Sequence, residues 1–288
     1  MKCYENGLFP FVFFSLLVVI TGSSSPEKYA ATLEVARSSV QRLGSNYGGW
    51  FVSLGLITNS SLIYSIGMGN DISFDLALIR NKGVTIHAFD ATPSSVKWYY
   101  QRLAAGKFPR VLISHHKHHR FMLSSADGNV TLKRPRGNAI SLAMASVTSP
   151  RDGWWSDAAV ELPGKSIWSM MSMLGHTKID VLKIDVEGSE FSIFKDLASS
   201  KEQNSRPQKR QFLDDKRLPI SPVLSFPVCQ ILVEFHPHFV ESPIAAVEAT
   251  WHLQSLGFDL IHFIHQRDGA QNALFVNARF CLLNQKAT

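Results

Sequence analysis

One short run constrains the fold of this 288-residue chain more than any other. It reads VLKIDVEGSE at residues 181–190, an apolar strand that stops on two carboxylates and a glycine directly before a helix. Ligands of open α/β sheets bind outside the carboxyl ends of the parallel strands. We therefore expect Asp185 and Glu187 to lie at the mouth of a parallel sheet, where acidic side chains favour a chemical role.

Strand and helix patterns alternate from residue 61 onward. This alternation predicts an α/β fold, a mostly parallel sheet with right-handed crossovers and helices on both faces. Residues 259–265 and 273–276 predict a closing antiparallel hairpin, and residues 121–124 and 130–132 flank another turn signal. The predicted strands are residues 62–66, 85–89, 181–184 and 230–234, and the predicted helices are residues 72–80, 94–103, 167–174, 190–197 and 244–256.

The chain is expected to be one domain behind an N-terminal targeting segment. Its 45% hydrophobic residues suffice for one large core over residues 26–288. Residues 1–25 have the charged, apolar and small-residue parts of a secretory signal peptide. The apolar run at residues 8–20 is shorter than the roughly 20 residues of a membrane helix. We therefore expect a cleaved signal and a secreted or lumenal protein, with a membrane anchor as the alternative.

Two irregular insertions are expected in the domain, at about residues 134–164 and 199–227. Long irregular segments in compact domains are usually functional or disordered. Trp154, Trp155 and Trp168 lie in or beside the first insertion. They are candidates for stacking on a sugar face, with ordinary core or lid packing as the alternative.

The net charge of +6 does not indicate a nucleic-acid partner. Much of the excess lies in the polar residues 201–217, which we expect to form a solvated loop, and no basic face interleaved with aromatics is visible.

Other features fit the secretory pathway only modestly. Asn59 and Asn129 begin glycosylation sequons. Cys229 and Cys281 lie beside apolar segments. We expect them to be buried thiols, with one bridge between them as the alternative.

A glycine pair follows the first predicted strand. Gly67 and Gly69 let the backbone turn sharply and approach a ligand beside a helix N-terminus. Asp90, at the end of the next strand, can accept both hydroxyls of a ribose, although capping of the following helix is its alternative role. Ile72 replaces the third glycine of a dinucleotide fingerprint. A nucleoside cofactor without a diphosphate fits better, and S-adenosylmethionine is the common one.

Four motifs together carry a family resemblance. They are YGGW at residues 47–50, IYSIGMGNDISF at 63–74, HAFDATP at 87–93 and DVLKIDVEGSEF at 180–191. They resemble the FkbM-type, methyltransferase-like proteins of eukaryotes, over about residues 40–280. The resemblance implies a Rossmann-like class I methyltransferase fold, with a seven-stranded sheet whose last strand is inserted antiparallel. It also implies S-adenosylmethionine over the first two strand ends.

The sequence departs from the wider class at one position. The acidic residue usual two positions before the first glycine is Ser65 here. Asp71 or Asp185 is then the candidate for the contact to the methionine amine of the cofactor, beside Gly67, Gly69 and Asp90.

The candidate bases lie at the ends of two strands. Methyl transfer from a sulfonium needs an aligned nucleophile, and an alcohol must also lose its proton. Glu187 is the preferred base, His236 the second, and Glu234 lies beside His236. The alternatives are a helix N-terminal carboxylate for Glu187 and a polar strand end for the other two residues.

No metal site is expected. The histidines of residues 115–119 point alternately to opposite faces if extended, and a solvated loop is the expectation for them. Binding of a hard cation by Asp185, Glu187 and Glu234 is the alternative.

These features predict an S-adenosylmethionine-dependent methyltransferase of the secretory pathway. The family resemblance and this compartment imply that it acts on a hydroxyl of a glycan or other small polyhydroxylated acceptor. Ser65 leaves open a non-catalytic protein that binds a nucleoside cofactor or a partner on the same fold. Ile72 and the closing hairpin argue against a nucleotide-dependent oxidoreductase.

Overall fold

The computed structural model describes residues 25–135, 145–146, 155–205, 226–237, 244–266 and 269–285. The expected targeting segment, Trp154 and most of the second insertion lie outside this part of the chain. Within the described ranges, no helix combines the length and the apolar character that a membrane crossing requires.

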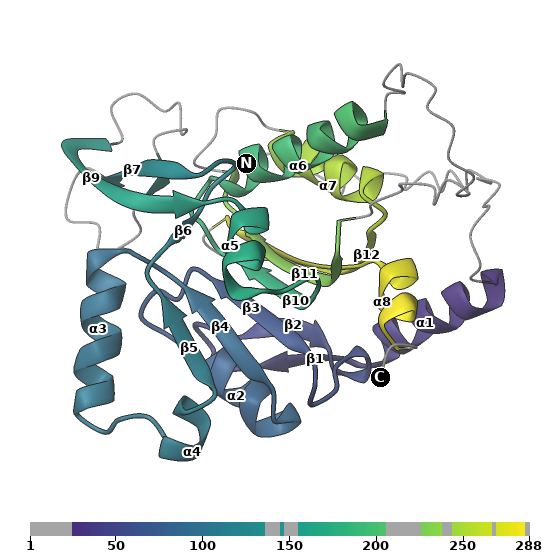
Figure 1. Ribbon diagram of the computed structural model, residues 1–288, viewed down its shortest axis with the longest axis horizontal. Coiled ribbons are helices and arrows are strands. Elements are labelled where there is room, and N and C mark those ends of the chain that lie inside the picture. The colour runs from purple at the N-terminus through teal and green to yellow at the C-terminus, as the bar shows by residue number, and fades with distance from the viewer. Residues whose placement is uncertain are drawn as a thin grey trace, which may run out of the picture.

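A seven-stranded sheet forms the centre of the described structure (Figure 1). Its strands are β3 (Leu62–Ile66), β4 (Thr85–Phe89), β5 (His116–His119), β10 (Ile179–Ile184), β11 (Val228–Phe235), β12 (Asp259–His265) and β13 (Gln271–Val276). They are ordered β12-β13-β11-β10-β3-β4-β5. The pairs from β11 to β5 are parallel, and β13 is antiparallel to both of its neighbours. This confirms the predicted sheet and its inserted last strand.

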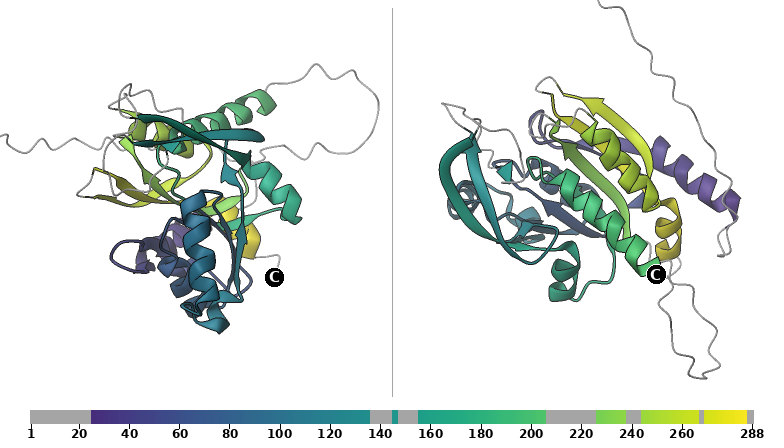
Figure 2. Two further views of the ribbon diagram at one scale, coloured as in Figure 1. Left: turned by 90° about the vertical axis from the view of Figure 1, so that its left-hand side faces the viewer. Right: turned by 90° about the horizontal axis from the view of Figure 1, so that it is seen from above.

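Helices cover both faces of this sheet, because alternate strand residues point to opposite sides. Leu182 and Ile184 belong to one core, with side chains of α5, α6 and α7, whereas Val181 belongs to the other, with α1, α2 and α8. Figure 2 shows α6 and α7 side by side on their face. The helices are α1 (Pro26–Ser38), α2 (Ser73–Lys82), α3 (Pro93–Ala104), α4 (Arg110–Ile113), α5 (Ile167–Leu174), α6 (Glu190–Ser205), α7 (Ala245–Ser255) and α8 (Ala278–Gln285), with a short 3-10 helix at Leu54–Leu56.

Two smaller sheets flank the central one. The antiparallel pair β1 (Val40–Leu43) and β2 (Trp50–Ser53) packs over the core that contains Val181. The second is a four-stranded sheet in the order β6-β9-β7-β8. Its strands are β6 (Met122–Leu123), β7 (Gly128–Pro135), β8 (Ala145–Ser146) and β9 (Trp155–Lys165).

The first insertion differs from the prediction of an irregular segment. Residues 155–165 form β9, which pairs antiparallel with β7 and parallel with β6, so β6 and β7 do not pair with each other. Val160 and Leu162 face a small core around Leu132. Pro163 and Gly164 interrupt this alternation in the sequence, which is why a strand was not predicted.

The second insertion also begins later than predicted. Helix α6 continues to Ser205, through residues expected to be a loop from residue 199. Lys, Glu and Gln in this stretch are good helix formers, although the stretch lacks the apolar periodicity that predicts a buried helix face.

Two cysteines form a disulfide, so the expectation of free buried thiols was wrong and the alternative holds. Cys229 of β11 is bonded to Cys281 of α8. The sequence signals did not predict α8, and only its packing against β11 brings the two residues together.

The histidine-rich run is an edge strand, and the expectation of a solvated loop was wrong. Residues 116–119 form β5 beside β4. Buried His116 lies 3.0 Å from Asp75 Oδ2 through its Nε2 and 3.1 Å from the Tyr99 hydroxyl through its Nδ1. These partners come from α2 and α3, so sequence proximity could not reveal them.

Candidate active site

The loops after β3 and β10 interlock at the carboxyl edge of the sheet. Gly67 has a φ of 77°, and a Cβ at this position would lie 1.8 Å from the carbonyl oxygen of Asp185. The Asp185 amide donates to the Ile66 carbonyl at 3.2 Å. Only glycine fits this contact. It holds together the glycine loop, residues 67–72 after β3, and the acidic loop, residues 185–189 after β10.

Asp90 braces the glycine loop from the end of β4. Its Oδ2 accepts hydrogen bonds from the amides of Met68 and Gly69, both at 3.1 Å, and its Oδ1 accepts one from Thr92 at 2.8 Å. A carboxylate offers about four acceptor positions. The arrangement therefore leaves room for one ribose hydroxyl rather than the two that we predicted. The contact with Thr92, the residue before α3, is not the capping of the helix that we gave as the alternative.

Asp71 is hydrogen-bonded to the turn between β1 and β2. Its carboxylate accepts hydrogen bonds from the Ser73 amide at 2.6 Å and the Ser45 hydroxyl at 2.7 Å. Burial opposes ionisation, but these hydrogen bonds outweigh it and hold the pKa of Asp71 below its usual value. Both oxygens already have partners, so of the two candidates for the cofactor amine the geometry favours Asp185.

Lys183 is a buried cation that the sequence analysis missed. It is 5% exposed, its Nζ donates to the Gly67 carbonyl at 2.6 Å, and it lies 4.7 Å from the centre of the Trp50 ring. Its Nζ is also 3.9 Å from Asp185 Oδ2. A lysine inside an apolar strand was the available signal. Lys183 fixes the glycine loop on the side where Ser65 replaces the usual acid.

His236 brings together three carboxylates from the β10 loop and α6. Its Nε2 lies 3.5 Å from Glu187 Oε2 and 3.9 Å from Asp185 Oδ1. Its Nδ1 lies 3.0 Å from Glu190 Oε1. Parallel pairing of β10 with β11 places the two strand ends at one edge, as the sequence predicted.

Glu190 is the second residue that the sequence analysis missed. It is 0% exposed, and besides the His236 ring it accepts hydrogen bonds from the amides of His236 at 2.7 Å and Gly188 at 2.9 Å. The preceding loop is unusual as well, since Glu187 is the sole non-glycine residue with positive φ in the described chain, at 52°. An acid in the first turn of a helix is common, so sequence alone did not distinguish Glu190.

The charges around His236 shift two pKa values. Burial would lower the pKa of His236, but the Glu190 carboxylate, followed by Glu187 and Asp185, raises it to about 10. Burial and the negative charge of Asp185 raise the pKa of Glu234 to about 8. Glu234 also accepts a hydrogen bond from Gln266 at 2.6 Å. These carboxylates therefore favour the protonated form of His236 at neutral pH, which does not suit the predicted base.

Tyr47, in the turn between β1 and β2, lies close to the acidic cluster that Asp185, Glu187 and Glu234 form. The residue is 86% exposed. Desolvation of its hydroxyl and the charges of Asp185 and Glu187 nevertheless raise its pKa. The cluster thus extends to the surface beside an aromatic ring.

The residues present fit a sulfonium cofactor. The carboxylates of Asp71, Asp185 and Glu187 face two cationic groups, Lys183 and His236, and a negative excess favours a positively charged ligand. In the glycine loop, the Asn70 Oδ1 atom is buried and has no hydrogen-bond partner within the described residues. An unpaired buried acceptor is costly, and a donor on a ligand would satisfy it.

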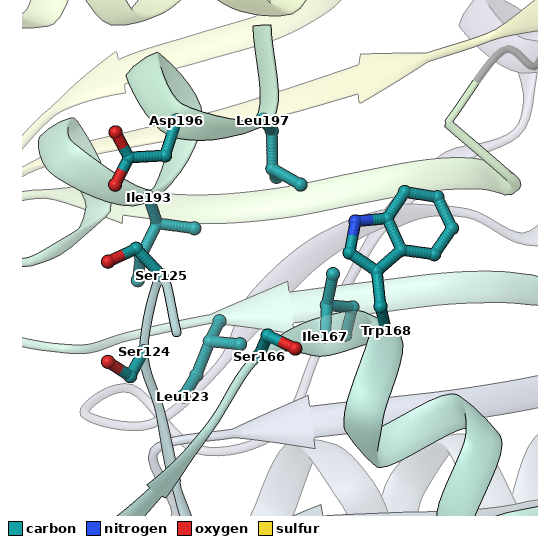
Figure 3. A pocket seen from close by; sticks show the side chains of 9 residues that line it. All are labelled: Leu123, Ser124, Ser125, Ser166, Ile167, Trp168, Ile193, Asp196 and Leu197. Atoms are coloured by element: carbon teal, nitrogen blue, oxygen red, sulfur yellow. The ribbon is translucent and has the colours of Figure 1, made fainter. Parts of the chain in front are cut away.

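A small pocket of about 50 Å³ lies between α5, α6 and the end of β6 (Figure 3). The ring of Trp168, which is 46% exposed, lies on one side, and Asp196, Ser124 and Ser125 lie on the other. The pocket is too small for a nucleoside cofactor, whose class of ligand needs about 300 Å³ or more.

Comparisons with known proteins found one family domain and several structures of low sequence identity. The FkbM methyltransferase domain matches residues 65–241. The N-terminal domain of human METTL16 in complex with SAH is 9% identical, with a TM-score of 0.39, and the match covers 76% of this chain and 62% of that one. The Methanococcus jannaschii fibrillarin pre-rRNA processing protein is 8% identical, with a TM-score of 0.41 and 81% of both chains covered. Precorrin-6y C5,15-methyltransferase from Geobacter metallireducens is 8% identical, with a TM-score of 0.36 and 87% of both chains covered.

Comparison with curated proteins gave no match. The family domain covers more than half of the residues and contains the glycine loop, Asp90, the acidic loop and His236. The chain therefore belongs to the FkbM methyltransferase family and is an S-adenosylmethionine-dependent methyltransferase domain.

Proposed function

We propose that this methyltransferase methylates a hydroxyl oxygen of a glycan or another small polyhydroxylated acceptor in the secretory pathway. The observation that carries the proposal is the contact between Gly67 and Asp185. It joins the loop that fits a nucleoside cofactor to the loop that carries the acidic cluster. Cofactor and proton acceptors then meet at one edge of the sheet.

The glycine loop and its supports would hold S-adenosylmethionine. Gly67 and Gly69 give the backbone close approach, Asp90 offers its remaining acceptor position to a ribose hydroxyl, and Asp185 faces the amine. The bound cofactor supplies an electrophilic methyl group on a sulfonium. The negative excess of the cluster stabilises that positive charge on binding.

Two carboxylates beside His236 are the candidates to take the acceptor proton. With S-adenosylmethionine bound as the methyl donor, Glu187 or Glu234 would take the proton that the acceptor hydroxyl must lose. Both side chains lie at the ends of the neighbouring strands β10 and β11, and β10 is paired with the strand that carries the glycine loop. General bases of this kind contribute roughly 10²-fold to 10⁴-fold to rate.

The exposed surface around Trp168, rather than the small pocket itself, supports a sugar-like acceptor. A half-exposed aromatic ring opposite serine hydroxyls and a carboxylate offers one apolar face and several hydrogen-bonding groups. Sugars present the same combination of an apolar ring face and a polar rim. Of the three tryptophans that we considered, Trp168 has a side chain within the described structure.

Two features support the secretory compartment. The disulfide between Cys229 and Cys281 is of the kind that persists in oxidising compartments. Asn59 and Asn129 are both exposed, as glycan acceptors must be. Residues 1–24, which carry the expected signal, lie outside the described chain.

A screen with cofactor labelled on its methyl group tests the reaction. The full chain is incubated with glycans, small alcohols, proteins and RNA, and we expect label on hydroxyl oxygens of the first two classes. Label on RNA or protein nitrogen alone would contradict the acceptor. Binding of S-adenosylhomocysteine without transfer to any class would indicate a binding protein, and calorimetric binding of NAD alone would indicate an oxidoreductase.

Two variants separate binding from turnover. Glu187→Gln should lower the turnover number while leaving the affinity for S-adenosylhomocysteine within about threefold. Asp90→Ala should weaken that affinity by about 1 to 3 kcal/mol, because it removes the acceptor of the Met68 and Gly69 amides. The exposed Glu248→Gln on α7 is the control for both. Equal activity of Glu187→Gln and the native protein would remove Glu187 from the reaction.

A further inference from the structure

We infer that Asp185, Glu187 and His236 form a binding site for one divalent transition-metal cation, with two carboxylate oxygens and one imidazole nitrogen as ligands. This departs from the expectation of no metal site. The sequence suggested Glu234 as the third ligand of any such site, whereas the structure places His236 there.

The ligand atoms converge. One oxygen of Asp185, one oxygen of Glu187 and one ring nitrogen of His236 all lie within 4.8 Å of one another. The Nε2 atom of His236 is 3.5 Å from Glu187 Oε2 and 3.9 Å from Asp185 Oδ1. Ligands at about 2.1 Å from one ion are themselves roughly 3 to 3.5 Å apart. Glu187 Oε2 already lies at this separation from Nε2, and a small inward movement of the Asp185 side chain completes the set.

The support of His236 is independent evidence for this role. Metal-binding histidines usually donate their second ring N–H to a carboxylate, which fixes the ring and directs the other nitrogen to the ion. Glu190 Oε1 takes this position, 3.0 Å from His236 Nδ1. Glu190 is itself fully buried and fixed by two backbone amides. Nε2 is thus directed at the two carboxylates, and a bound cation would displace the proton that this nitrogen carries in the ion-free protein.

The backbone also positions Glu187 for this role. Its left-handed conformation is uncommon for a residue with a side chain. The following amide, that of Gly188, is fixed by Glu190 Oε2 at 2.9 Å. The same buried carboxylate therefore organises the loop of one ligand and the ring of another, so the site is built before an ion arrives.

The donor set selects the class of ion. Mg²⁺ and Ca²⁺ prefer oxygen ligands alone, whereas Mn²⁺ and Zn²⁺ accept imidazole together with carboxylates. The two carboxylates match the charge of one divalent ion, and Asp185 would bind it through Oδ1 and keep Oδ2 for the cofactor amine. If the proposed function holds, such an ion would orient the acceptor hydroxyl and favour loss of its proton, a role that rests on that proposal.

Mn²⁺ binding to the full chain tests the site directly. After treatment with a chelator, the protein is titrated with Mn²⁺, and free ion is followed by electron paramagnetic resonance. We expect one ion per chain, displaced by Zn²⁺ and not by an equal concentration of Mg²⁺. Absence of both Mn²⁺ and Zn²⁺ binding would overturn the inference.

Matched variants locate the ion. Glu187→Gln and His236→Gln should each weaken Mn²⁺ binding by at least tenfold. Glu190→Gln should weaken it by roughly 10-fold to 100-fold through loss of the supporting contact. Glu234→Gln alters a neighbouring carboxylate outside the ligand set and should keep the native affinity within about threefold. Undiminished binding in Glu187→Gln, checked for folding by circular dichroism, would also overturn the site.

The outcomes for the ion and for the reaction are distinguishable. One Mn²⁺ per chain together with no transfer to any hydroxyl acceptor would contradict the proposed function and leave the cation site standing. Hydroxyl methylation that persists in a protein without any Mn²⁺ or Zn²⁺ binding would overturn the cation site and support the proposed function.

Discussion

The Nδ1 atom of His236 lies 3.0 Å from the fully buried Oε1 atom of Glu190, and this contact joins the loop after β11 to the first turn of α6. The same carboxylate also accepts the His236 and Gly188 amides. Three donors from two loops therefore depend on one side chain. Its removal would leave them unpaired in the interior.

Glu190→Ala should lower the free energy of unfolding by about 3 to 5 kcal/mol, because it breaks a buried pair and leaves His236 without its carboxylate. Urea unfolding followed by circular dichroism measures the change. Glu248→Ala, an exposed acid on α7, should stay within about 0.5 kcal/mol of the native protein. A Glu190→Ala protein as stable as this control would show that the contact is not structural.

Gly67→Ala and Gly69→Ala form a matched pair. Both glycines have positive φ, but a Cβ at position 67 would strike the Asp185 carbonyl, whereas none of the described atoms lies within 4 Å of one at position 69. Gly69→Ala should cost about 1 to 2 kcal/mol of backbone strain. Gly67→Ala should cost more and should also abolish calorimetric binding of S-adenosylhomocysteine. Similar effects of both changes would contradict the interlock of the two loops.

Reduction of the Cys229–Cys281 disulfide should destabilise the fold. The bridge closes a span of 52 residues, for which the chain-entropy treatment gives about 4 kcal/mol. We expect a lower melting temperature in dithiothreitol for the native protein. A Cys229→Ala/Cys281→Ala double variant should melt at the same temperature with and without reductant. If dithiothreitol does not change the melting temperature of the native protein, the bridge is refuted.

His87 should make the protein sensitive to acid. Burial, followed by the charges of His119 and His176, lowers its pKa from 6.5 to about 4. Between these pH values His87 binds a proton in the unfolded chain but not in the folded chain. The free energy of unfolding therefore falls as the pH drops from about 6.5 towards 4. His87→Phe should shrink the loss of unfolding free energy between pH 7 and pH 4.5.

Exposed His265 provides the control for this pH effect. His265→Asn should leave the acid-induced loss as it is in the native protein. If His87→Phe and the native protein lose stability equally over the same pH range, neighbouring histidines or other groups account for the acid sensitivity.

The sequence predicted the parts of the fold whose residues carry their own signal. The strands at residues 62–66, 85–89 and 181–184 are apolar runs between turn signals, and each is present within two residues of its predicted bounds. The closing hairpin is present too. The convergence of Asp185, Glu187 and His236 followed from parallel pairing alone, because neighbouring strand ends share one edge.

Other parts depend on distant partners and were missed for that reason. The β5 strand is rich in histidine, and His116 is buried only because Asp75 and Tyr99 supply hydrogen bonds. Glu190 resembles an ordinary helix-start acid until His236 is placed beside it. Lys183 is evident in the sequence, but the carbonyl groups to which it donates, at the end of β3, are identified only by the structure.

The interlock of Gly67 with Asp185 also bears on how this enzyme family can diversify. A carbonyl of one loop fills the space that a side chain of the other would need, so neither loop can lengthen or shift while its neighbour stays in place. Substitutions around the Trp168 pocket or on the exposed turn at Tyr47 should therefore disturb the two loops less than substitutions in the acidic loop itself. Libraries that randomise those two surfaces should retain cofactor binding far more often than libraries built at residues 185–188.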